Sequence, residues 1–190
     1  MLRIRGERKE SIRPDFDWAS VLAQAVGQVV HAELQRMADA AVPRTVDGRA
    51  EARWRRELAA LGIEGPHLES GLGRIRHAMT VVTRSAQAGR LLDPQAREGR
   101  SELALTAMID GAAQSLRIDR SFVDGQGVRW IVDWKVSAHE GGDREAFLDE
   151  QLRRYRAQLE RYARAMKLLE PERRLKVGLY FPLQDAWREL

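Results

Sequence analysis

One stretch constrains the fold more than any other: residues 128–136, with the sequence Val-Arg-Trp-Ile-Val-Asp-Trp-Lys-Val. Its β-branched and aromatic residues favour a strand, and the side chains of a strand alternate between its two faces. Asp133 and Lys135 therefore share one face, with Cα atoms about 6.6 Å apart, whereas the other face is almost wholly apolar. An acid beside an amine on a largely buried strand is either a structural ion pair or part of a functional site.

Two further strand-like runs precede this one, at residues 102–109 and 112–123, and the dipeptide Asp-Gly at residues 110–111 separates them. Asp-Gly between two such runs is the strongest short signal for a hairpin with a two-residue turn. Counting back from this turn along the ladder places Glu102 opposite Asp119.

A second loop, with the sequence Asp-Gly-Gln-Gly, leads into the central run. Read as a three-residue loop at residues 125–127, it places Asp119 opposite Asp133. Together with Glu102, three carboxylates then fall in one row across three strands, about 5 Å apart, where like charges destabilise a sheet. Such a row favours a site for a hard metal ion. The alternative is that slipped registers or bulges separate the acids.

A helix is predicted between Trp18 and Met37, because apolar residues recur there at helical spacing, and Asp17 is its expected N-cap. His31 lies one turn beyond Gly27, and a glycine at that place allows another element to approach the imidazole. Taken alone, a single histidine on a helix is more often structural or solvated than a ligand.

The middle of the chain is predicted to be mostly helical. Residues 43–48 form a loop in this prediction, residues 50–61 a short arginine-rich helix, and residues 67–88 a second long helix. Residues 89–99, which contain two glycines and a proline, are predicted to link this helical half to the strands.

A polar loop is predicted at residues 137–149, leading into a long amphipathic helix that Pro171 ends. Gln158 lies at the edge of the apolar stripe of this helix, and the opposite face is rich in arginine. Residues 175–181 predict one more strand, which after a crossover helix runs parallel to the Asp133 strand. The stripe consists of Leu148, Leu152, Tyr155, Leu159, Tyr162, Met166 and Leu169.

Composition excludes several classes of site. The chain has no cysteine, which rules out disulfides, thiolate zinc sites and cysteine nucleophiles. It contains no Gly-x-x-x-x-Gly-Lys-Ser/Thr loop, so no ATP-driven motor is expected within it. The absence of a signal peptide or a long apolar run favours a cytoplasmic protein. The 32 Lys and Arg against 28 Asp and Glu allow a phosphate partner, although a solvated basic surface is the commoner explanation.

Four motifs in order resemble those of one family, the RecB-type nuclease domain of the PD-(D/E)XK superfamily, found at the C-terminal end of bacterial helicase–nucleases of the RecB and AddA kind. Residues 27–34 resemble its helical glycine and histidine motif, residues 117–122 its isoleucine-aspartate strand, residues 131–135 its Asp-Tyr-Lys core, and residues 155–162 its Tyr-x-x-Gln-Leu-x-x-Tyr helix. The differences are Trp134 for the usual tyrosine, Arg117 where glycine is frequent, and no threonine-aspartate pair after Lys135.

The resemblance implies an α/β (α+β) fold with a PD-(D/E)XK core, in which helices flank a central mixed sheet of about four to five strands. An N-terminal helical region precedes this core. We therefore expect a single nuclease domain over residues 1–190, with residues 1–13 as a loose lead-in, residues 14–99 as the helical region and residues 100–185 as the catalytic sheet and helix.

The resemblance also implies roles for individual residues. His31, Asp119, Asp133 and the backbone carbonyl of Trp134 would bind Mg²⁺ or Mn²⁺, with Asp119, Asp133 and Lys135 as the catalytic residues. Additional residues would support the site. Glu102 would be an outer or occasional ligand, and Gln158, Tyr162 and Tyr155 would hold the site or contact DNA.

The function implied is a metal-dependent DNA nuclease, expected to be an exonuclease that processes double-strand breaks beside a helicase motor domain in cis or in a separate subunit. One alternative is a DNA-binding or interaction module that keeps the nuclease fold without catalysis. A second is a structural domain whose row of acids is an artefact of the assumed register.

Overall fold

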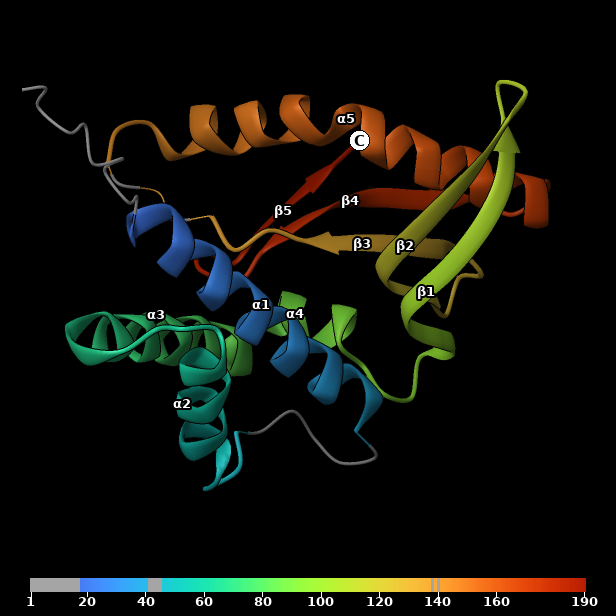
Figure 1. The fold of residues 1–190 in the computed structure, drawn as a ribbon. Helices are drawn as coiled ribbons and strands as arrows, with labels where there is room; N and C mark the ends of the chain where they lie inside the picture. Colours follow the sequence, from blue (N-terminus) through green and yellow to red (C-terminus); the bar gives the residue numbers. More distant parts are fainter. Residues whose placement is uncertain (1–17, 41–45, 138, 140) are drawn as a thin grey trace, which may run out of the picture.

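The computed structural model describes residues 18–190 except residues 41–45, 138 and 140. The expected lead-in at residues 1–13 and the expected cap Asp17 lie outside the described residues, as does most of the loop predicted at residues 43–48. Figure 1 shows a sheet with helices on both of its faces, which confirms the predicted α/β class.

The described chain begins with a helical half and continues with the sheet (Figure 1). The helices are α1 (Trp18–Asp39), α2 (Ala50–Ala60), α3 (Gly65–Arg84) and α4 (Ala86–Leu91). An antiparallel meander follows, made of β1 (Arg97–Ile109), β2 (Ala112–Val123) and β3 (Arg129–Trp134). Helix α5 (Arg144–Leu169) leads to β4 (Leu175–Phe181), and β5 (Ala186–Glu189) completes the sheet in the order β1-β2-β3-β4-β5.

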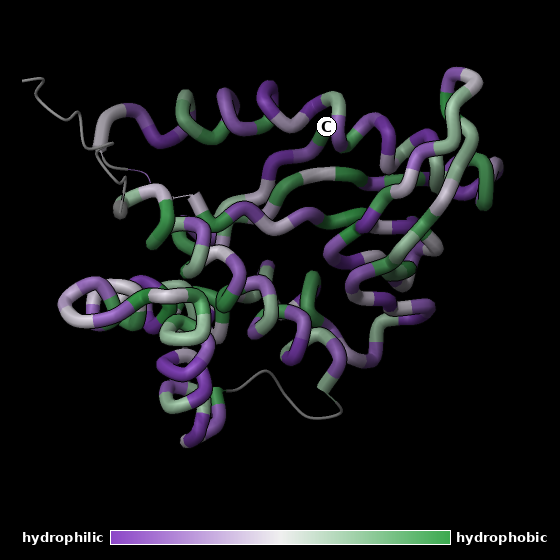
Figure 2. Tube along the Cα trace, in the orientation of Figure 1, coloured by the Kyte–Doolittle hydropathy of each residue, from purple (hydrophilic) through white to green (hydrophobic). Residues whose placement is uncertain are grey.

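The sheet separates two apolar cores, as the alternation along β3 predicts. Val132 and Trp134 pack with the core residues of α1 to α4, whereas Ile131 packs with those of α5. Figure 2 shows hydrophilic and hydrophobic segments alternating along α5, as expected for a helix with one buried side. β4 pairs with β3 in parallel, as predicted for a strand that follows a crossover helix.

Both predicted hairpin registers are confirmed. Ile109 pairs with Ala112 across the Asp-Gly turn, and Arg120 pairs with Val132 across the second loop. One step further along each ladder, Asp119 falls opposite Asp133. On the other side of β2, the flanking pairs of β1 and β2 place Glu102 opposite Asp119, as counted from the sequence.

The long helix predicted at residues 67–88 is in fact two helices. Its first part, α3, begins at Gly65 and ends at Arg84, because the Ser85 side chain accepts a hydrogen bond from the backbone N–H of Ala88 and starts α4. The linker predicted at residues 89–99 is therefore wrong. Residues 89–91 belong to α4, and β1 already begins at Arg97.

Four other features differ from the prediction. Helix α5 begins at Arg144 within the predicted polar loop, because the Asp143 carboxylate accepts hydrogen bonds from the first backbone N–H groups of the helix. At the other end of α5, Leu169 is exposed, so the buried stripe stops at Met166. β3 ends at Trp134, two residues short of the predicted run, and β5 was not predicted.

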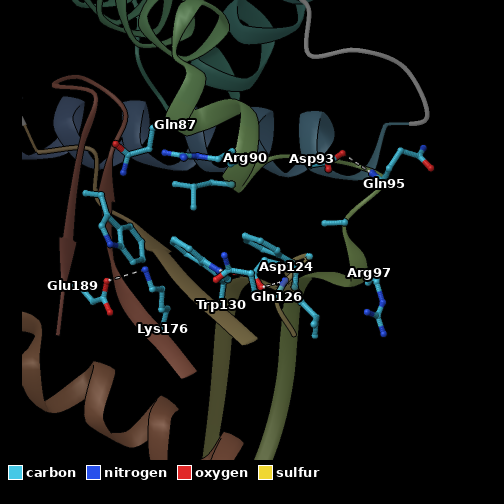
Figure 3. A pocket seen from close by; sticks show the side chains of 16 residues that line it. Gln87, Arg90, Asp93, Gln95, Arg97, Asp124, Gln126, Trp130, Lys176 and Glu189 are labelled. Atoms are coloured by element: carbon cyan, nitrogen blue, oxygen red, sulfur yellow. Dashed lines mark hydrogen bonds and ion pairs between the residues drawn. The ribbon is translucent and has the colours of Figure 1, made fainter. Parts of the chain in front are cut away.

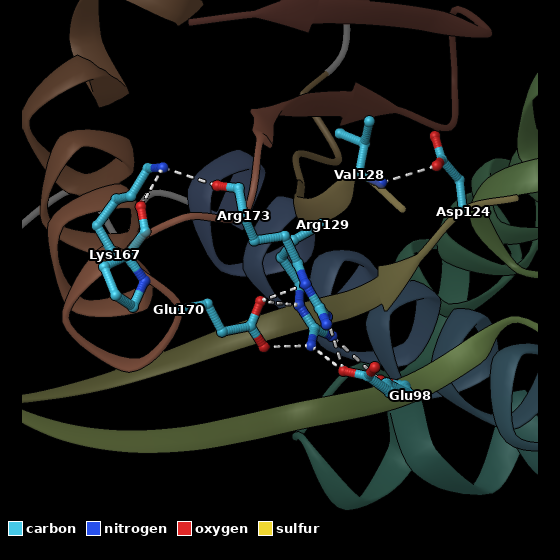
Figure 4. A network of polar contacts seen from close by, with 8 residues as sticks. Glu98, Asp124, Val128, Arg129, Lys167, Glu170 and Arg173 are labelled. Atoms are coloured by element: carbon cyan, nitrogen blue, oxygen red, sulfur yellow. Dashed lines mark hydrogen bonds and ion pairs between the residues drawn. The ribbon is translucent and has the colours of Figure 1, made fainter. Parts of the chain in front are cut away.

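A buried arginine fixes the far end of the central strand (Figure 4). Arg129, at the start of β3, forms ion pairs with Glu98 in β1 and with Glu170 just beyond α5. Arg173 also bonds to Glu98. This network ties β1, β3 and the end of α5 together at the end of β3 remote from Asp133.

Candidate active site

His31, Asp119 and Trp134 meet where α1 passes the end of β3. The imidazole Nε2 of His31 lies 3.0 Å from the carbonyl oxygen of Trp134, and its Nδ1 lies 3.7 Å from Oδ2 of Asp119. The same Asp119 oxygen accepts a hydrogen bond of 2.7 Å from the backbone N–H of Trp134. The three groups predicted from sequence patterns far apart in the chain therefore converge.

Asp133 is the most buried acid of this cluster, with a relative exposure of 2%. Its Oδ1 accepts a hydrogen bond of 2.9 Å from the side-chain amide of Gln158. Its Oδ2 forms an ion pair of 2.5 Å with the Lys135 ammonium, yet among the described residues this oxygen has no well-aligned hydrogen bond. A buried carboxylate oxygen without a complete set of partners is costly unless another ligand is meant to occupy it.

Burial changes the protonation of the two groups beside Asp133. It lowers the pKa of His31 below 6.5, even though the charge of Asp133 opposes this, so the imidazole is neutral at pH 7 and can act as a ligand. It raises the pKa of Asp119 to about 7, and the neighbouring carboxylate of Asp133 contributes to the rise. Two acids that repel in a poorly solvated place favour either a proton or a cation between them.

Helix α5 supplies the residues that hold Asp133 and Lys135. The Lys135 ammonium lies 4.1 Å from the centre of the Tyr155 ring, within the range of a cation–π contact. Gln158 donates a second hydrogen bond, to the hydroxyl of Tyr162, and that hydroxyl donates to the backbone carbonyl of Arg117. Burial raises the pKa of Tyr162 to about 12, so the hydroxyl stays protonated and serves as a donor.

Glu102 lies at the margin of this cluster, where its charge acts on His31 and Asp119. Its carboxylate forms an ion pair of 3.2 Å with Arg117, and its backbone has a positive φ of 49°, which is unusual for a residue other than glycine. The register places its Cα opposite Asp119, and its charge helps to raise the pKa of Asp119, but among the described residues its carboxylate forms no hydrogen bond or ion pair with His31 or Asp119. The predicted row of three acids is therefore a close pair with a third acid at its margin.

Sequence patterns missed the network that holds α1 in place. Glu33, two residues after His31, is buried and accepts hydrogen bonds from Arg53 and from the indole N–H of Trp54, both in α2. Arg36, one turn after Glu33, forms ion pairs with Glu33 and with Glu57 of α2. An acid within an apolar helical stripe was the available signal, because such a residue is rarely buried without partners.

The comparison with known families agrees with this geometry. The profile of the PD-(D/E)XK nuclease superfamily matches residues 3–186. The chain belongs to the PD-(D/E)XK nuclease superfamily. No curated protein matches the chain. Membership makes this a nuclease domain, a hydrolase that binds DNA, in a superfamily whose members generally use divalent metal ions.

The side chains of this PD-(D/E)XK domain fit a divalent ion in kind. Carboxylate oxygens, a carbonyl oxygen and a neutral imidazole are donors that Mg²⁺ and Mn²⁺ accept. Within the described ranges, no three His, Asp or Glu side chains already form a closed metal-binding cluster. Oδ1 of Asp133 accepts a hydrogen bond from Gln158, and its Oδ2 faces the Lys135 ammonium without an aligned hydrogen bond among the described residues.

None of the described helices has both the length and the apolar composition of a membrane span.

Proposed function

We propose that this PD-(D/E)XK domain is a Mg²⁺- or Mn²⁺-dependent deoxyribonuclease of RecB type that hydrolyses phosphodiester bonds as an exonuclease. The observation that carries the proposal is the convergence of His31, Asp119 and Asp133 beside the Lys135 ammonium. Structural ion pairs alone do not require a neutral imidazole, two mutually repelling acids and an amine at one place. A metal-dependent hydrolase can use all of them, with the acids and the imidazole as ligands and the amine beside the phosphate.

In this proposal His31, Asp119, Asp133 and the Trp134 carbonyl hold the ion. When bound, it supplies positive charge that lowers the pKa of a water and offsets the charge of the scissile phosphate. Lys135 orients the attacking water with its N–H donors and stabilises the extra negative charge that develops on the phosphate oxygens. The water releases a proton to solvent as its oxygen joins phosphorus, the bond to the leaving oxygen breaks, and the leaving oxygen takes up a proton from solvent.

Two surrounding residues keep these groups in position. Gln158 fixes the orientation of the Asp133 carboxylate, and Tyr155 confines the Lys135 ammonium through its ring face. The exposed arginines of α5 include Arg153 and Arg161, and they add binding to the DNA backbone that does not depend on base sequence.

The biological setting that we propose is the repair or recombination of double-strand breaks in the cytoplasm of a bacterial-type cell. A helicase motor, in cis or as a separate subunit, would feed DNA to the domain. The support for this part is the order of the four RecB-type motifs along the chain. The competing candidate is a nuclease fold that binds DNA without cleaving it. The complete set of His31, Asp119, Asp133 and Lys135 favours the active enzyme.

A cleavage assay tests the proposal. Purified full chain is incubated with end-labelled linear duplex and with single strands in Mg²⁺, in Mn²⁺ and in EDTA. We expect cleavage only with a metal ion. Lys135→Ala should lower the rate at least about 100-fold, the range for loss of one transition-state donor, while retardation of DNA on a gel persists.

Lys167→Ala is the matched control, because Lys167 lies near the end of α5 and, in the described part of the chain, its ammonium donates hydrogen bonds to the backbone carbonyls of Pro171 and Arg173. It should cleave like the wild type. Binding without any loss of substrate in the wild type, in both metals and with both substrates, would support the inactive module and overturn the proposal.

A further inference from the structure

A second cavity lies on the face of the sheet opposite to Asp133. It has a volume of about 760 Å³ and is bounded by α4, by the turn between β2 and β3, and by the near ends of β4 and β5. Trp130, in its floor, precedes Asp133 by three residues and points to the opposite face, so the two sites are separated by about 10 Å along β3 and by the sheet itself. Figure 3 shows Arg90 and Gln87 on one side of this cavity and Trp130 on the other.

Three aromatic rings form the floor of the cavity. Phe122 and Trp130 are stacked, with ring centres 5.8 Å apart and planes 10° apart, and Trp187 contacts Trp130 at 5.5 Å. Gly178 makes room for this arrangement, since a Cβ there would lie 2.7 Å from the Trp187 ring. Phe122 is buried beneath this arrangement, with an exposure of 4%, so the partly exposed rings of Trp130 and Trp187 form the surface on which a ligand can stack.

The charges around this floor leave two cations available. Asp124 accepts hydrogen bonds from the indole N–H of Trp130 and from two backbone N–H groups of its own loop. Glu189 pairs with Lys176 at 3.7 Å, and Asp93 accepts the backbone N–H of Gln95. In contrast, Arg90 and Arg97 form no ion pair within the described part of the chain, and both are exposed at the rim. The acids are satisfied internally, whereas the arginines are free to meet an anion.

From these features we infer that the cavity binds a nucleotide, with the base stacked on the partly exposed rings of Trp130 and Trp187 and the phosphate paired with Arg90 at the rim. Base stacking on aromatic side chains and arginine contacts to phosphate are the usual means of holding single strands without sequence preference. A volume of about 760 Å³ is within the range of small-ligand sites. The nucleotide is either free or part of a single strand. Binding itself does not depend on the proposed function, whereas the idea that the nucleotide is a product of DNA cleavage by this domain rests on it.

Binding in EDTA tests the inference without any hydrolysis. The probes are deoxythymidine monophosphate, a ten-residue oligodeoxythymidylate and inorganic phosphate. The readout is the NMR shift of the indole N–H of Trp130, which lies in the floor and donates to Asp124. We expect both nucleotide probes to move this signal in a saturable way and phosphate alone to leave it in place.

Two variants and one control locate the site. Arg90→Glu removes a rim cation from the last turn of α4, and Trp130→Leu removes the stacking surface. Each should weaken binding at least tenfold, the range for one stacked base or one charge pair. Arg84→Glu is the control, because Arg84 is an exposed arginine in the last turn of α3 and does not line the cavity. It should bind within twofold of the wild type.

The relative affinities of the two nucleotide probes identify the ligand. Tighter binding of the oligomer than of the monophosphate assigns the cavity to a single strand, and equal binding assigns it to free nucleotides. Loss of binding in Arg84→Glu equal to that in Arg90→Glu, or oligomer binding with an unmoved Trp130 signal, would overturn the inference. Because the measurement contains no metal ion, either result stands whether or not the domain cleaves DNA.

Discussion

The side-chain amide of Gln158 donates a hydrogen bond of 2.9 Å to Oδ1 of Asp133, although 25 residues separate them in the chain. The contact joins α5 to the end of β3 on the face that carries the catalytic candidates. It fixes which oxygen of Asp133 faces the helix and which faces Lys135. The orientation of the acid is therefore set by a residue of α5.

Replacement of Gln158 by alanine should weaken Mn²⁺ binding and lower the cleavage rate about 10- to 100-fold, the usual cost of losing the partner of a ligating carboxylate. The measurements are titration calorimetry with Mn²⁺ and the cleavage assay at saturating metal. Gln151→Ala is a matched control, because it removes the same side chain from the same helix two turns earlier. Equal losses in both variants would assign the effect to α5 as a whole and not to the hydrogen bond.

The position of Lys135 depends on the face of Tyr155, whose ring centre lies 4.1 Å from the ammonium nitrogen. Tyr155→Phe keeps this face and should cleave within about threefold of the wild type, whereas Tyr155→Leu should lose roughly tenfold or more, consistent with a cation–π contact of about 1–2 kcal/mol. The cleavage rate should fall while the affinity for DNA stays constant. A variant Tyr155→Phe as impaired as Tyr155→Leu would show that the hydroxyl, and not the ring, matters.

The register of the strands explains why much of this site was predictable. The Asp-Gly turn and the three-residue loop fix the pairing of β1, β2 and β3, and the two-residue alternation then determines that Asp119 and Asp133 are neighbours. The approach of His31 depends instead on packing between α1 and the sheet. No local pattern encodes that packing, so only the family resemblance pointed to it.

Side-chain direction was the least predictable feature. Glu102 has the backbone position counted from the turn, but its carboxylate forms an ion pair with the neighbouring Arg117 and no hydrogen bond with the acids of the site among the described residues. The break between α3 and α4 was missed because the helical periodicity continues across Ser85, whose side chain caps the second helix. The aromatic floor of the cavity beside α4 was not predicted, for another reason. Trp187 lies in a four-residue strand too short for an alternating pattern.

The raised pKa of Asp119 gives a pH dependence for the metal-free protein. Burial raises this pKa from 3.8 to about 7, so the folded state holds a proton that the unfolded chain has released. The free energy of unfolding should therefore fall as the pH rises from about 4 to about 7, by at most about 4 kcal/mol from this group. Urea unfolding in EDTA, compared between wild type and Asp119→Asn, isolates the effect. The free energy of unfolding of the variant should increase relative to that of the wild type as the pH rises.

Asp124 provides the control of opposite sign. Its pKa is lowered, first by the hydrogen bond from the Trp130 indole, so its contribution to stability is present at neutral pH and is lost as the pH falls. Asp124→Asn should therefore differ most from the wild type at neutral pH and least in acid. A difference between wild type and Asp119→Asn that does not change between pH 4.5 and pH 8 would contradict the buried, repelling pair of acids.

Anomalous diffraction from crystals soaked in Mn²⁺ tests the central claim most directly. The convergence of His31, Asp119 and Asp133 predicts one strong peak bounded by these three side chains and the carbonyl of Trp134, and no such peak in crystals of Asp133→Asn. A peak bound elsewhere, or an empty cluster at Mn²⁺ concentrations that support cleavage of DNA, would contradict it.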